Sequence, residues 1–368
     1  MKHYLLLITS LLLLHAAMAQ KSDCGTRTPK TPVMVNPGWK IQPLEQYTSP
    51  LLMKVFVRVI ANDDGTQRAA QDTSVMKQLE NMRQFYAGQN ICFILAGIEQ
   101  LNSTDLSTHN AETEEGGLTP FLIPGLLNIF IHRTLFNNDG NLNGTAYDIP
   151  NYYLSVSSSA INSTGSNEGN RSTTAHEMGH CFGLLHTFET NYGVENIRRT
   201  APCMNCFTAG DLVCDTEADP HSDEYDTGGH ITDCEFSDPG KTQNCNGTQI
   251  QYRMNPRNIM AYGVRSCRER FTDGQGSRAR SFINNTLVLQ LCIAPDTDNV
   301  TVSQTISSGR KFIIARNDIT INATAFTASN SARVNISSNN AVVIKSGATF
   351  SPATNNAYTN VTASSLCF

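Results

Sequence analysis

The segment from His176 to His186 carries residue types at the spacing that metal chemistry needs. Its sequence is HEMGHCFGLLH. His176 and His180 are four residues apart, so on one face of a helix both imidazoles can reach the same ion. Glu177 follows the first histidine, and its carboxylate can lie beside the ion without taking a coordination position. Three imidazole ligands leave a fourth position open for water, which is typical of catalytic zinc.

The glycine before the third histidine decides whether His186 can join the other two. A continuing helix would carry His186 around its axis and away from the ion. Gly183 tolerates a positive φ, so the chain can leave the helix there and return the third imidazole to the metal. A helix with incidental histidines is the alternative interpretation, but all five fixed residues at this spacing rarely occur together by chance. We therefore predict a catalytic zinc site held by His176, His180 and His186, with Glu177 as the catalytic carboxylate.

A second segment, NIMAY at residues 258–262, strengthens this prediction. Together with the histidine segment it resembles the metzincin signature, in which a methionine turn follows the zinc helix. The resemblance implies that Met260 lies beneath the histidines as an apolar floor. It also implies that Tyr262 lies near the zinc and supports the oxyanion.

Within the metzincins, the chain resembles the pappalysin family, peptidase family M43, over about residues 50–290. The segments that carry this resemblance are GLLHTF at 183–188, GDLVCDT at 210–216, NIMAY at 258–262 and FTDGQ at 271–275. It implies an α+β fold with a metzincin-type catalytic domain. A mixed, twisted sheet of four or five strands would pack on two long helices, one of them the zinc helix. Substrate would lie extended between this part and an irregular lower subdomain from about 187 to 290.

The remaining catalytic expectations concern Glu177 and Cys24. Glu177 is expected to act as general base, taking a proton from the attacking water and delivering it to the leaving amine. The resemblance to pappalysin zymogens implies a cysteine switch, in which the Cys24 thiolate occupies the open zinc position until the pro-segment is cut. A disulfide at Cys24 is the alternative.

The domain organisation follows from composition. Lys2, the short apolar run at 4–14 and the small residues before Gln20 are typical of a signal peptide over 1–19. Residues 20–48 are interpreted as a pro-segment and 49–294 as the catalytic domain. Residues 295–368 lose most charges and gain Ser, Thr and Asn, which predicts a small all-β module, either a sandwich or a short coil of strands.

Alternating and helical patterns predict the main elements of the catalytic domain. Strands are expected at Leu51–Ala61, 91–99, Leu126–His132 and Tyr152–Ser157. Helices are expected at Asp72–Gly88, Arg171–Leu185 and Gly274–Cys292.

The 11 cysteines indicate an oxidising compartment. Six of them are interpreted as disulfides that staple the lower loops, although the C-x-x-C at 203–206 could instead bind zinc. These six are Cys203, Cys206, Cys214, Cys234, Cys245 and Cys267. Cys92 and Cys181 are expected as buried free thiols beside Cys24.

Acidic side chains crowd the segment between residues 211 and 226, where they could hold one or two calcium ions. A solvated acidic loop is the alternative. The residues concerned are Asp211, Asp215, Glu217, Asp219, Asp223, Glu224 and Asp226.

The net charge of −5 and the absence of a long basic run argue against nucleic acid as a partner, and no apolar run after residue 19 is long enough for membrane insertion. We expect a secreted zinc metalloendopeptidase acting on proteins or peptides, extracellular or periplasmic, with a surface or carbohydrate contact through the C-terminal module. A catalytically inactive adhesin and a cell-wall amidase are the alternatives. Arg265, Arg268 and Arg270 argue against a basic preference after the scissile bond.

Overall fold

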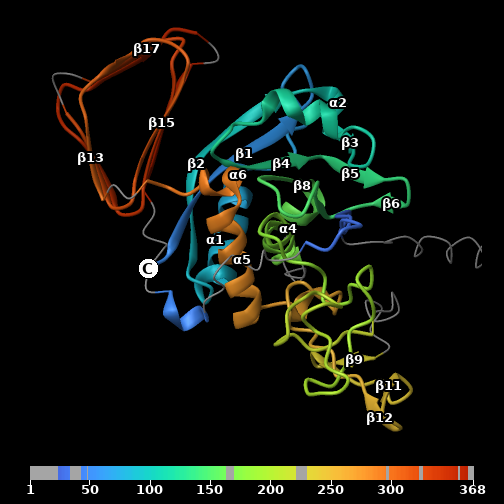
Figure 1. Cartoon of the computed structure of the whole chain (residues 1–368). Helices are drawn as coiled ribbons and strands as arrows, with labels where there is room; N and C mark the ends of the chain where they lie inside the picture. The colour runs from blue at the N-terminus through green and yellow to red at the C-terminus, as the bar shows by residue number, and fades with distance from the viewer. Residues whose placement is uncertain are drawn as a thin grey trace, which may run out of the picture.

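The computed structural model describes residues 24–33, 43–47, 49–162, 170–220, 230–295, 298–322, 326–354 and 357–363 (Figure 1). The predicted signal peptide and part of the predicted pro-segment lie outside these residues. Three regions are visible: a sheet with helices, an irregular lower part, and a coil of strands at the C-terminal end of the chain. The expectation of an α+β catalytic part with a separate all-β tail agrees with this arrangement.

A five-stranded sheet forms the core of the first region. Its order is β2-β1-β4-β8-β7, and its neighbours are parallel except β7 and β8. The strands are β1 (Leu51–Ala61), β2 (Ile91–Asn102), β4 (Leu127–His132), β7 (Gly144–Ala146) and β8 (Tyr153–Ser157). The four strands expected from the sequence are confirmed, whereas the short β7 was not expected. It forms one edge of the sheet.

The helices cover one face of this sheet (Figure 1). They are α1 (Asp72–Ala87), α4 (Thr173–Cys181), α5 (Asp273–Asn285) and α6 (Leu287–Gln290). The Tyr86 hydroxyl of α1 donates to the Ala175 carbonyl of α4 at 3.0 Å. This bond fixes the zinc-motif helix against the long first helix.

Two helix predictions need correction. The helix expected at Arg171–Leu185 has only nine residues, because Gly183 adopts a φ of 86° and the chain turns out of the helix. The helix expected at Gly274–Cys292 is two helices, separated at Thr286, whose backbone is extended. A capping box between Thr272 and Gln275 begins the first of them.

Short elements complete the upper region. A second sheet, in the order β3-β5-β6, lies beyond the β7–β8 side of the main sheet (Figure 1). The short elements are η1 (Leu44–Gln46), α2 (Thr104–Ser107), β3 (Thr108–Asn110), η2 (Glu115–Phe121), β5 (Thr134–Asn137), β6 (Gly140–Asn141) and α3 (Ser158–Ile161). They lie where the sequence is polar and lacks periodicity, which is why only the longer strands were expected.

The lower region has little regular structure and is held by disulfides. The bonds Cys203–Cys245, Cys206–Cys214 and Cys234–Cys267 pair all six cysteines expected there. The zinc alternative for residues 203–206 is therefore wrong. The regular elements of this region are β9 (Ile231–Thr232), β10 (Glu235–Phe236), β11 (Thr242–Cys245), β12 (Thr248–Gln251) and η4 (Arg265–Cys267).

The expectation of a free thiol holds for Cys24 and Cys181 but not for Cys92, which is disulfide-bonded. Cys292, buried at the end of α6, is the further free thiol among the described residues. Sequence alone could not separate these cysteines, because every one of them is a small apolar side chain that packs well in a core.

The C-terminal region is a coil of three turns, each made of three strands (Figure 1). The strands of successive turns lie in parallel register in three sheets, so the expectation of a short coil is confirmed and the sandwich alternative is wrong. The first turn has β13 (Asn299–Val302), β14 (Thr305–Ile306) and β15 (Arg310–Ala315). The second has β16 (Asp318–Ile321), β17 (Thr327–Asn330) and β18 (Arg333–Ser338). The third has β19 (Ala341–Ile344), β20 (Thr349–Pro352) and β21 (Tyr358–Ala363).

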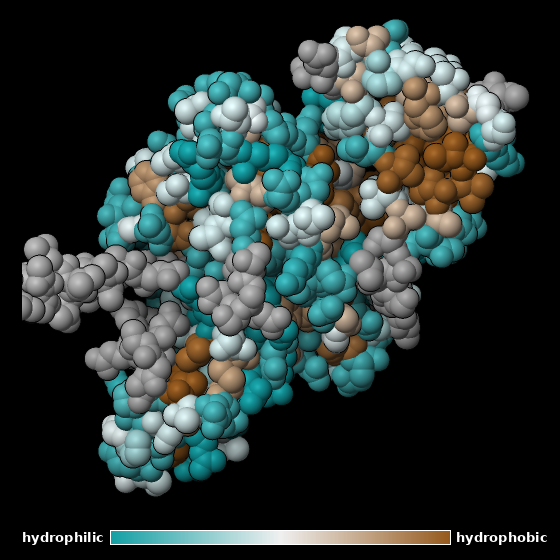
Figure 2. Space-filling view, turned by 180° about the vertical axis from the view of Figure 1, so that it is seen from behind, coloured by the Kyte–Doolittle hydropathy of each residue, from teal (hydrophilic) through white to brown (hydrophobic). Residues whose placement is uncertain are grey.

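Apolar side chains fill the coil, including Ile319, Ile321 and Ile336, which are fully buried. Its third turn is more open: Val343, Ile344 and Val361 are roughly half exposed. Figure 2 shows a large apolar area on this region from behind.

The coil packs on the face of the main sheet opposite to the helices. Phe312 of β15 meets Phe56 of β1 edge to face, with ring centroids 5.6 Å apart. Gly97 of β2 lies so close to Asn335 of β18 that a Cβ would come within 2.4 Å of its side-chain oxygen. Strand β1 is therefore buried on both faces, which explains its nearly continuous apolar sequence.

Among the described residues, no helix is long and apolar enough to cross a membrane.

The packing of the coil predicts a local stability effect. Ile321→Ala removes a fully buried side chain and should lower the free energy of unfolding of the coil by roughly 2–5 kcal/mol. Val343→Ala, at a half-exposed site of the same region, should change it by less than about 0.5 kcal/mol. Urea unfolding followed by hydrogen exchange in peptides from 299–363 measures both. Equal effects of the two variants would contradict a coil with an ordered core.

Candidate metal centre

The three histidines of the motif converge on one point. His176 and His180 project from α4, and His186 follows the turn at Gly183. The three Nε2 atoms form a triangle with sides of 3.2, 3.2 and 3.1 Å. All three side chains are buried, so their nitrogens face one another rather than solvent.

Hydrogen bonds to backbone carbonyls orient two of these rings. Nδ1 of His176 lies 2.7 Å from the Ile259 carbonyl oxygen, and Nδ1 of His180 lies 2.9 Å from the Leu184 carbonyl oxygen. A carbonyl can only accept, so each Nδ1 must carry the proton. In a neutral ring the Nε2 atom then keeps its lone pair, which is the form that binds a metal ion.

The distances between these atoms fit a tetrahedral ion. Zinc binds imidazole nitrogen at about 2.0–2.1 Å, which places two such nitrogens about 3.4 Å apart at a tetrahedral angle. A zinc–thiolate bond of about 2.3 Å places sulfur about 3.6 Å from each nitrogen. Cys24 Sγ lies 3.5 Å from His180 Nε2. The four ligand atoms of Cys24 and the three histidines all lie within 4.8 Å of one another.

Two glycines allow the close packing around the histidines. Gly183 permits the turn, and a Cβ there would also lie 2.4 Å from the Phe282 ring of α5. A Cβ at Gly179 would lie 2.7 Å from the sulfur of Met260. The methionine of the second motif therefore lies directly against the helix that carries His176 and His180.

Glu177 is fully buried beside the cluster of ligand atoms. Its Oε2 accepts a hydrogen bond from the Thr26 hydroxyl at 2.9 Å and from the Ala146 amide at 3.1 Å. Cys24 Sγ lies 3.3 Å from the same oxygen. The side chain packs so closely on Gly144 of β7 that a Cβ there would lie 2.6 Å away. Its carboxylate is therefore adjacent to Cys24 Sγ, the fourth of the candidate ligand atoms.

Tyr262 lies on the other side of the centre. Its ring centroid is 5.0 Å from that of His186 and 4.6 Å from that of Phe188. Its hydroxyl donates to the Cys24 carbonyl oxygen at 3.4 Å. A hydroxyl in this place can donate to a carbonyl of any chain that passes the metal position.

Residues 24–33, in the predicted pro-segment, pass between the sheet and the lower region. Near the sheet, the Gly25 amide donates to the Gly144 carbonyl of the edge strand β7 at 2.9 Å, and Arg27 forms an ion pair with Glu112. On the lower side, the Tyr192 hydroxyl donates to the Pro29 carbonyl at 2.8 Å. This segment therefore occupies the space that leads to the metal ligands.

Burial and the neighbouring Glu177 carboxylate raise the pKa of the Cys24 thiol. A thiolate in this buried position requires a strong cation beside it. A metal ion among these four candidate ligands would neutralise the thiolate and account for three facing imidazole nitrogens.

A second polar group that the sequence did not single out contains Glu195. This residue lies with Asp211 beneath the lower loops, and both are more than nine-tenths buried. Burial and the charge of Asp211 raise the pKa of Glu195 to about 8, although Arg199, 2.8 Å from Glu195 Oε1, opposes the shift. Burial raises the pKa of Asp211 to about 7. Glu195 was missed because it lies outside the acidic segment of the sequence.

The other acidic residues of that segment have separate places. Asp215 accepts from the Gly274 amide and the Thr272 hydroxyl, both at 2.7 Å, so it caps the start of α5. Asp219 accepts from the Thr187 hydroxyl at 2.7 Å. Asp223, Glu224 and Asp226 lie outside the described residues.

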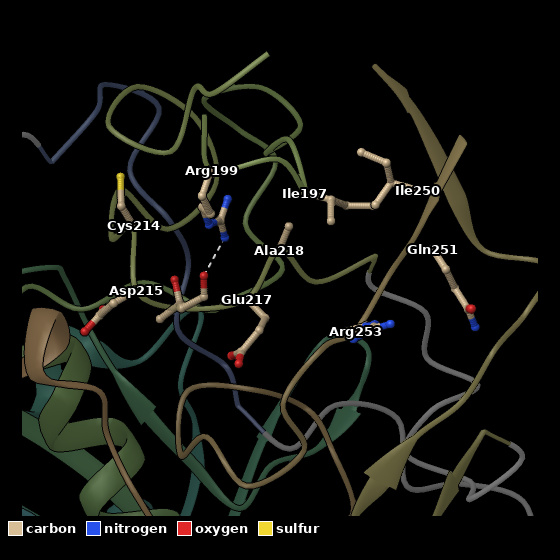
Figure 3. Close-up of a pocket in the computed structure, with 10 residues that line it drawn as sticks. Ile197, Arg199, Cys214, Asp215, Glu217, Ala218, Ile250, Gln251 and Arg253 are labelled. Carbon is tan, nitrogen blue, oxygen red and sulfur yellow. Dashed lines mark hydrogen bonds between the residues drawn. The ribbon is translucent and has the colours of Figure 1, made fainter. Parts of the chain in front are cut away.

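A hollow of about 440 Å³ opens in the lower region (Figure 3). Arg199 donates to the Thr216 carbonyl at its wall, with Glu217 and Arg253 nearby. None of the three histidines lines it. This hollow is therefore separate from the candidate metal centre.

The three arginines after the methionine turn differ in their surroundings. Arg268 is buried, donates to the Gly263 carbonyl at 2.9 Å and lies with its guanidinium carbon 5.5 Å from the Tyr262 ring centroid. Arg265 donates to Asn170 at 3.4 Å, and Arg270 is exposed. Of these, Arg268 lies close to the metal centre through Tyr262.

Comparisons with known proteins find similarity to metalloproteases. The model of the peptidase M43 family, described as pregnancy-associated plasma protein-A, matches residues 126–284. An extracellular metalloprotease of Podospora anserina is 27% identical over 243 residues, covering 62% of this chain and 72% of the relative. An extracellular metalloprotease of Pyricularia oryzae is 26% identical over 251 residues, covering 63% of this chain and 75% of the relative. A promirolysin mutant of Tannerella forsythia aligns with a TM-score of 0.47 and 18% identity, covering 68% of this chain and 85% of that one.

The buried acid pair predicts a pH dependence of stability. The pKa values of Glu195 and Asp211 in the folded chain, about 8 and about 7, lie above the ordinary values of 4.5 and 3.8. Between about pH 4 and 8 the folded state therefore binds more protons than the unfolded state. The contribution of this pair to the free energy of unfolding should be fully present below about pH 4 and should be lost as the pH rises to 8.

Thermal unfolding with a chelator across this range tests the effect. The double variant Glu195→Gln/Asp211→Asn keeps the shapes of the side chains and should flatten the dependence between pH 5 and 8. An unchanged slope in the double variant would assign the pH effect to other groups.

Proposed function

We propose that this chain, which belongs to the peptidase M43 family of metalloendopeptidases, is made as a secreted zymogen and uses one zinc ion to cleave proteins internally. The relatives named extracellular metalloproteases support secretion, as does the N-terminal sequence typical of a signal peptide. We keep the division into signal peptide 1–19, pro-segment 20–48, catalytic domain 49–294 and C-terminal module 295–368. An extracellular location is favoured over a periplasmic one by the same relatives.

One observation carries the proposal: the Nε2 atoms of His176, His180 and His186 lie 3.1–3.2 Å apart in a buried position. Three such nitrogens cannot satisfy one another by hydrogen bonds when Nδ1 holds the proton. A single ion at their centre satisfies all three. The imidazole set and the tetrahedral distances favour zinc.

Bound zinc supplies a Lewis acid that polarises a carbonyl and lowers the pKa of water towards about 7. Glu177 is the proposed general base: Oε2 takes a proton from the attacking water and passes it to the leaving amine nitrogen. Tyr262 donates a hydrogen bond to the oxygen of the scissile carbonyl as negative charge develops there. Met260 holds the helix of His176 and His180 in place from below.

The same geometry supports latency. Cys24 lies at the fourth ligand position, and the Thr26 hydroxyl donates to the oxygen of Glu177 that the mechanism needs. The proposed zymogen is therefore blocked at the metal and at the general base by residues two apart in the chain. Removal of the pro-segment frees both.

Glu177→Ala should lower kcat by roughly 10²–10⁴-fold while zinc content stays unchanged, because the carboxylate moves protons but does not bind the ion. Digestion of a denatured protein mixture by the pro-segment-free chain, with mass spectrometry of the new termini, measures the cuts. Metal analysis of the same sample measures zinc. Cys181→Ala, four residues along the same helix, is the matched control and should keep full activity.

Internal cuts should also disappear when zinc is removed by a chelator and return when it is added back. Cuts that persist in Glu177→Ala would exclude it as the base. Zinc bound by the wild-type chain without any cuts would overturn the endopeptidase proposal, and cell-wall peptides would then be the next substrates to test.

Cys24→Ala should release latency in the full chain. We expect at least about tenfold faster cleavage of a peptide substrate by the uncut variant, because thiolate binding to zinc is lost. Cobalt substitution gives a readout other than activity: the wild-type zymogen should show thiolate-to-metal charge-transfer absorption that the variant lacks. Cys292→Ala, at a buried thiol just after α6, is the control. The same absorption in Cys24→Ala would exclude Cys24 as the ligand.

We further propose that Glu195 and Asp211 hold a calcium ion. Two buried carboxylates close to each other favour a hard cation, and Asp211 Oδ2 has no hydrogen-bond partner among the described residues. Calcium would favour their charged forms, so it should restore at pH 8 the stability that the pH titration above removes. A wild-type chain indifferent to calcium at that pH would exclude the site.

A further inference from the structure

The C-terminal coil carries a ladder of cationic and aromatic side chains. Arg310 of β15, Arg333 of β18 and Tyr358 of β21 occupy the same register position in three successive turns. Neighbouring parallel strands lie about 4.8 Å apart. Two like charges at this spacing repel each other, so the ladder needs an anion beside it.

Glu99 of β2 supplies one negative charge to this ladder. Its carboxylate accepts from Arg310 Nη2 at 2.8 and 2.5 Å and from Arg333 Nη1 at 3.2 Å. A third guanidinium, that of Arg58 on β1, lies with Nε 4.0 Å from the same carboxylate. Within the described part of the chain, three cations thus share one carboxylate.

The excess positive charge is partly buried. The Arg58 side chain is 5% exposed, and its Nη1 has no hydrogen-bond partner among the described residues. Burial, more than the two neighbouring arginines, lowers its pKa to about 10. The Nε of Arg310 is likewise without a partner in the described structure. If these residues served only to hold the two regions together, one arginine paired with one carboxylate would suffice. No guanidinium N–H group would then lack a hydrogen-bond partner.

A hollow of about 660 Å³ opens beside this cluster, between the edge strand β2 and the coil. Such a volume holds a small organic ligand. Its lining is polar and comes from both regions: Ile98, Glu99, Gln100, Asn102, Arg333, Tyr358 and Asn360. Arg333 connects the two features, because it belongs to the charge cluster and also lines the hollow.

We propose that this hollow binds the carboxylate or sulfate group of an acidic saccharide. Arg333, which lines the hollow, supplies the guanidinium for the anionic group, since arginine forks match planar and tetrahedral oxyanions. The net positive charge of the three arginines and Glu99 favours an anion beside it.

Gln100 donates to Asn102 Oδ1 at 2.8 Å, so the oxygen of Gln100 can accept from sugar hydroxyls and the NH2 group of Asn102 can donate to them. Asn360 donates to Asn335 at 3.3 Å, and its oxygen can accept from a sugar hydroxyl. Tyr358 adds an aromatic ring to the same wall. The site would attach the enzyme to a charged glycan and is independent of peptide hydrolysis.

Titration calorimetry with the full chain tests the proposal. The probes are a heparin tetrasaccharide, a hyaluronan tetrasaccharide, neutral maltotetraose and inorganic sulfate. We expect binding of both acidic saccharides, weakened by salt, no binding of maltotetraose, and only weak competition by sulfate. Binding of sulfate as tight as that of the saccharides would overturn the saccharide assignment, and no binding of either acidic saccharide would overturn the site.

Matched variants locate the binding. Arg333→Gln should weaken saccharide binding roughly tenfold, because one charged donor is lost. Lys345→Gln removes an equal charge from an exposed site of the same coil and should change the affinity less than about twofold. Asn360→Ala should weaken binding without changing its salt dependence. Unfolding midpoints of all variants check folding. Equal losses in Arg333→Gln and Lys345→Gln would show a general charge effect and contradict the site.

Discussion

The convergence of three imidazole nitrogens in a buried position is the constraint on which the rest of the structure depends. A helix supplies two of them at a spacing of four residues, but no regular helix supplies the third. The chain must leave α4 at Gly183 and still bring His186 back within about 3 Å of its partners. Such an arrangement is costly unless every nitrogen has a partner. Backbone carbonyls at Ile259 and Leu184 take the outer nitrogens of two rings, which leaves the Nε2 atoms facing one another in the geometry that the proposed zinc ion requires.

Each layer around the histidines serves this arrangement. The long helix α1 fixes α4 through Tyr86, and Met260 supports α4 at Gly179, where a larger residue would not fit. Strand β7 brings Gly144 against Glu177, which keeps the carboxylate beside the metal position. The disulfides of the lower region reinforce its small apolar cluster of Ile231, Met254 and Ala261. The coil covers the opposite face of the sheet and so buries β1 completely.

The features that could be predicted from the sequence are those determined by residues close together in the chain. The patterns of β1 and α1 depend on neighbouring residues, and the structure has both elements where they were expected. The spacing of the histidines and the change of composition after residue 295 are equally local, but the ligand roles and the domain boundary drawn from them stay predictions. Long-range pairings could not be predicted in the same way. Glu195 meets Asp211 only because the lower loops fold together, Cys92 forms a disulfide although it resembles a buried thiol, and Glu99 joins arginines of a region that begins 200 residues later.

The path of residues 24–33 has a consequence for how activity can begin. A blocking segment that belongs to the same chain as the site it covers is present at an effective concentration of order millimolar, whatever the dilution of the protein. A substrate at ordinary concentration competes poorly with a blocking segment that is part of the same chain. A high concentration of substrate therefore cannot by itself activate the enzyme. Activation of the proposed zymogen is therefore irreversible. Once the chain is cut, the blocking segment diffuses away, and no change of conditions brings it back.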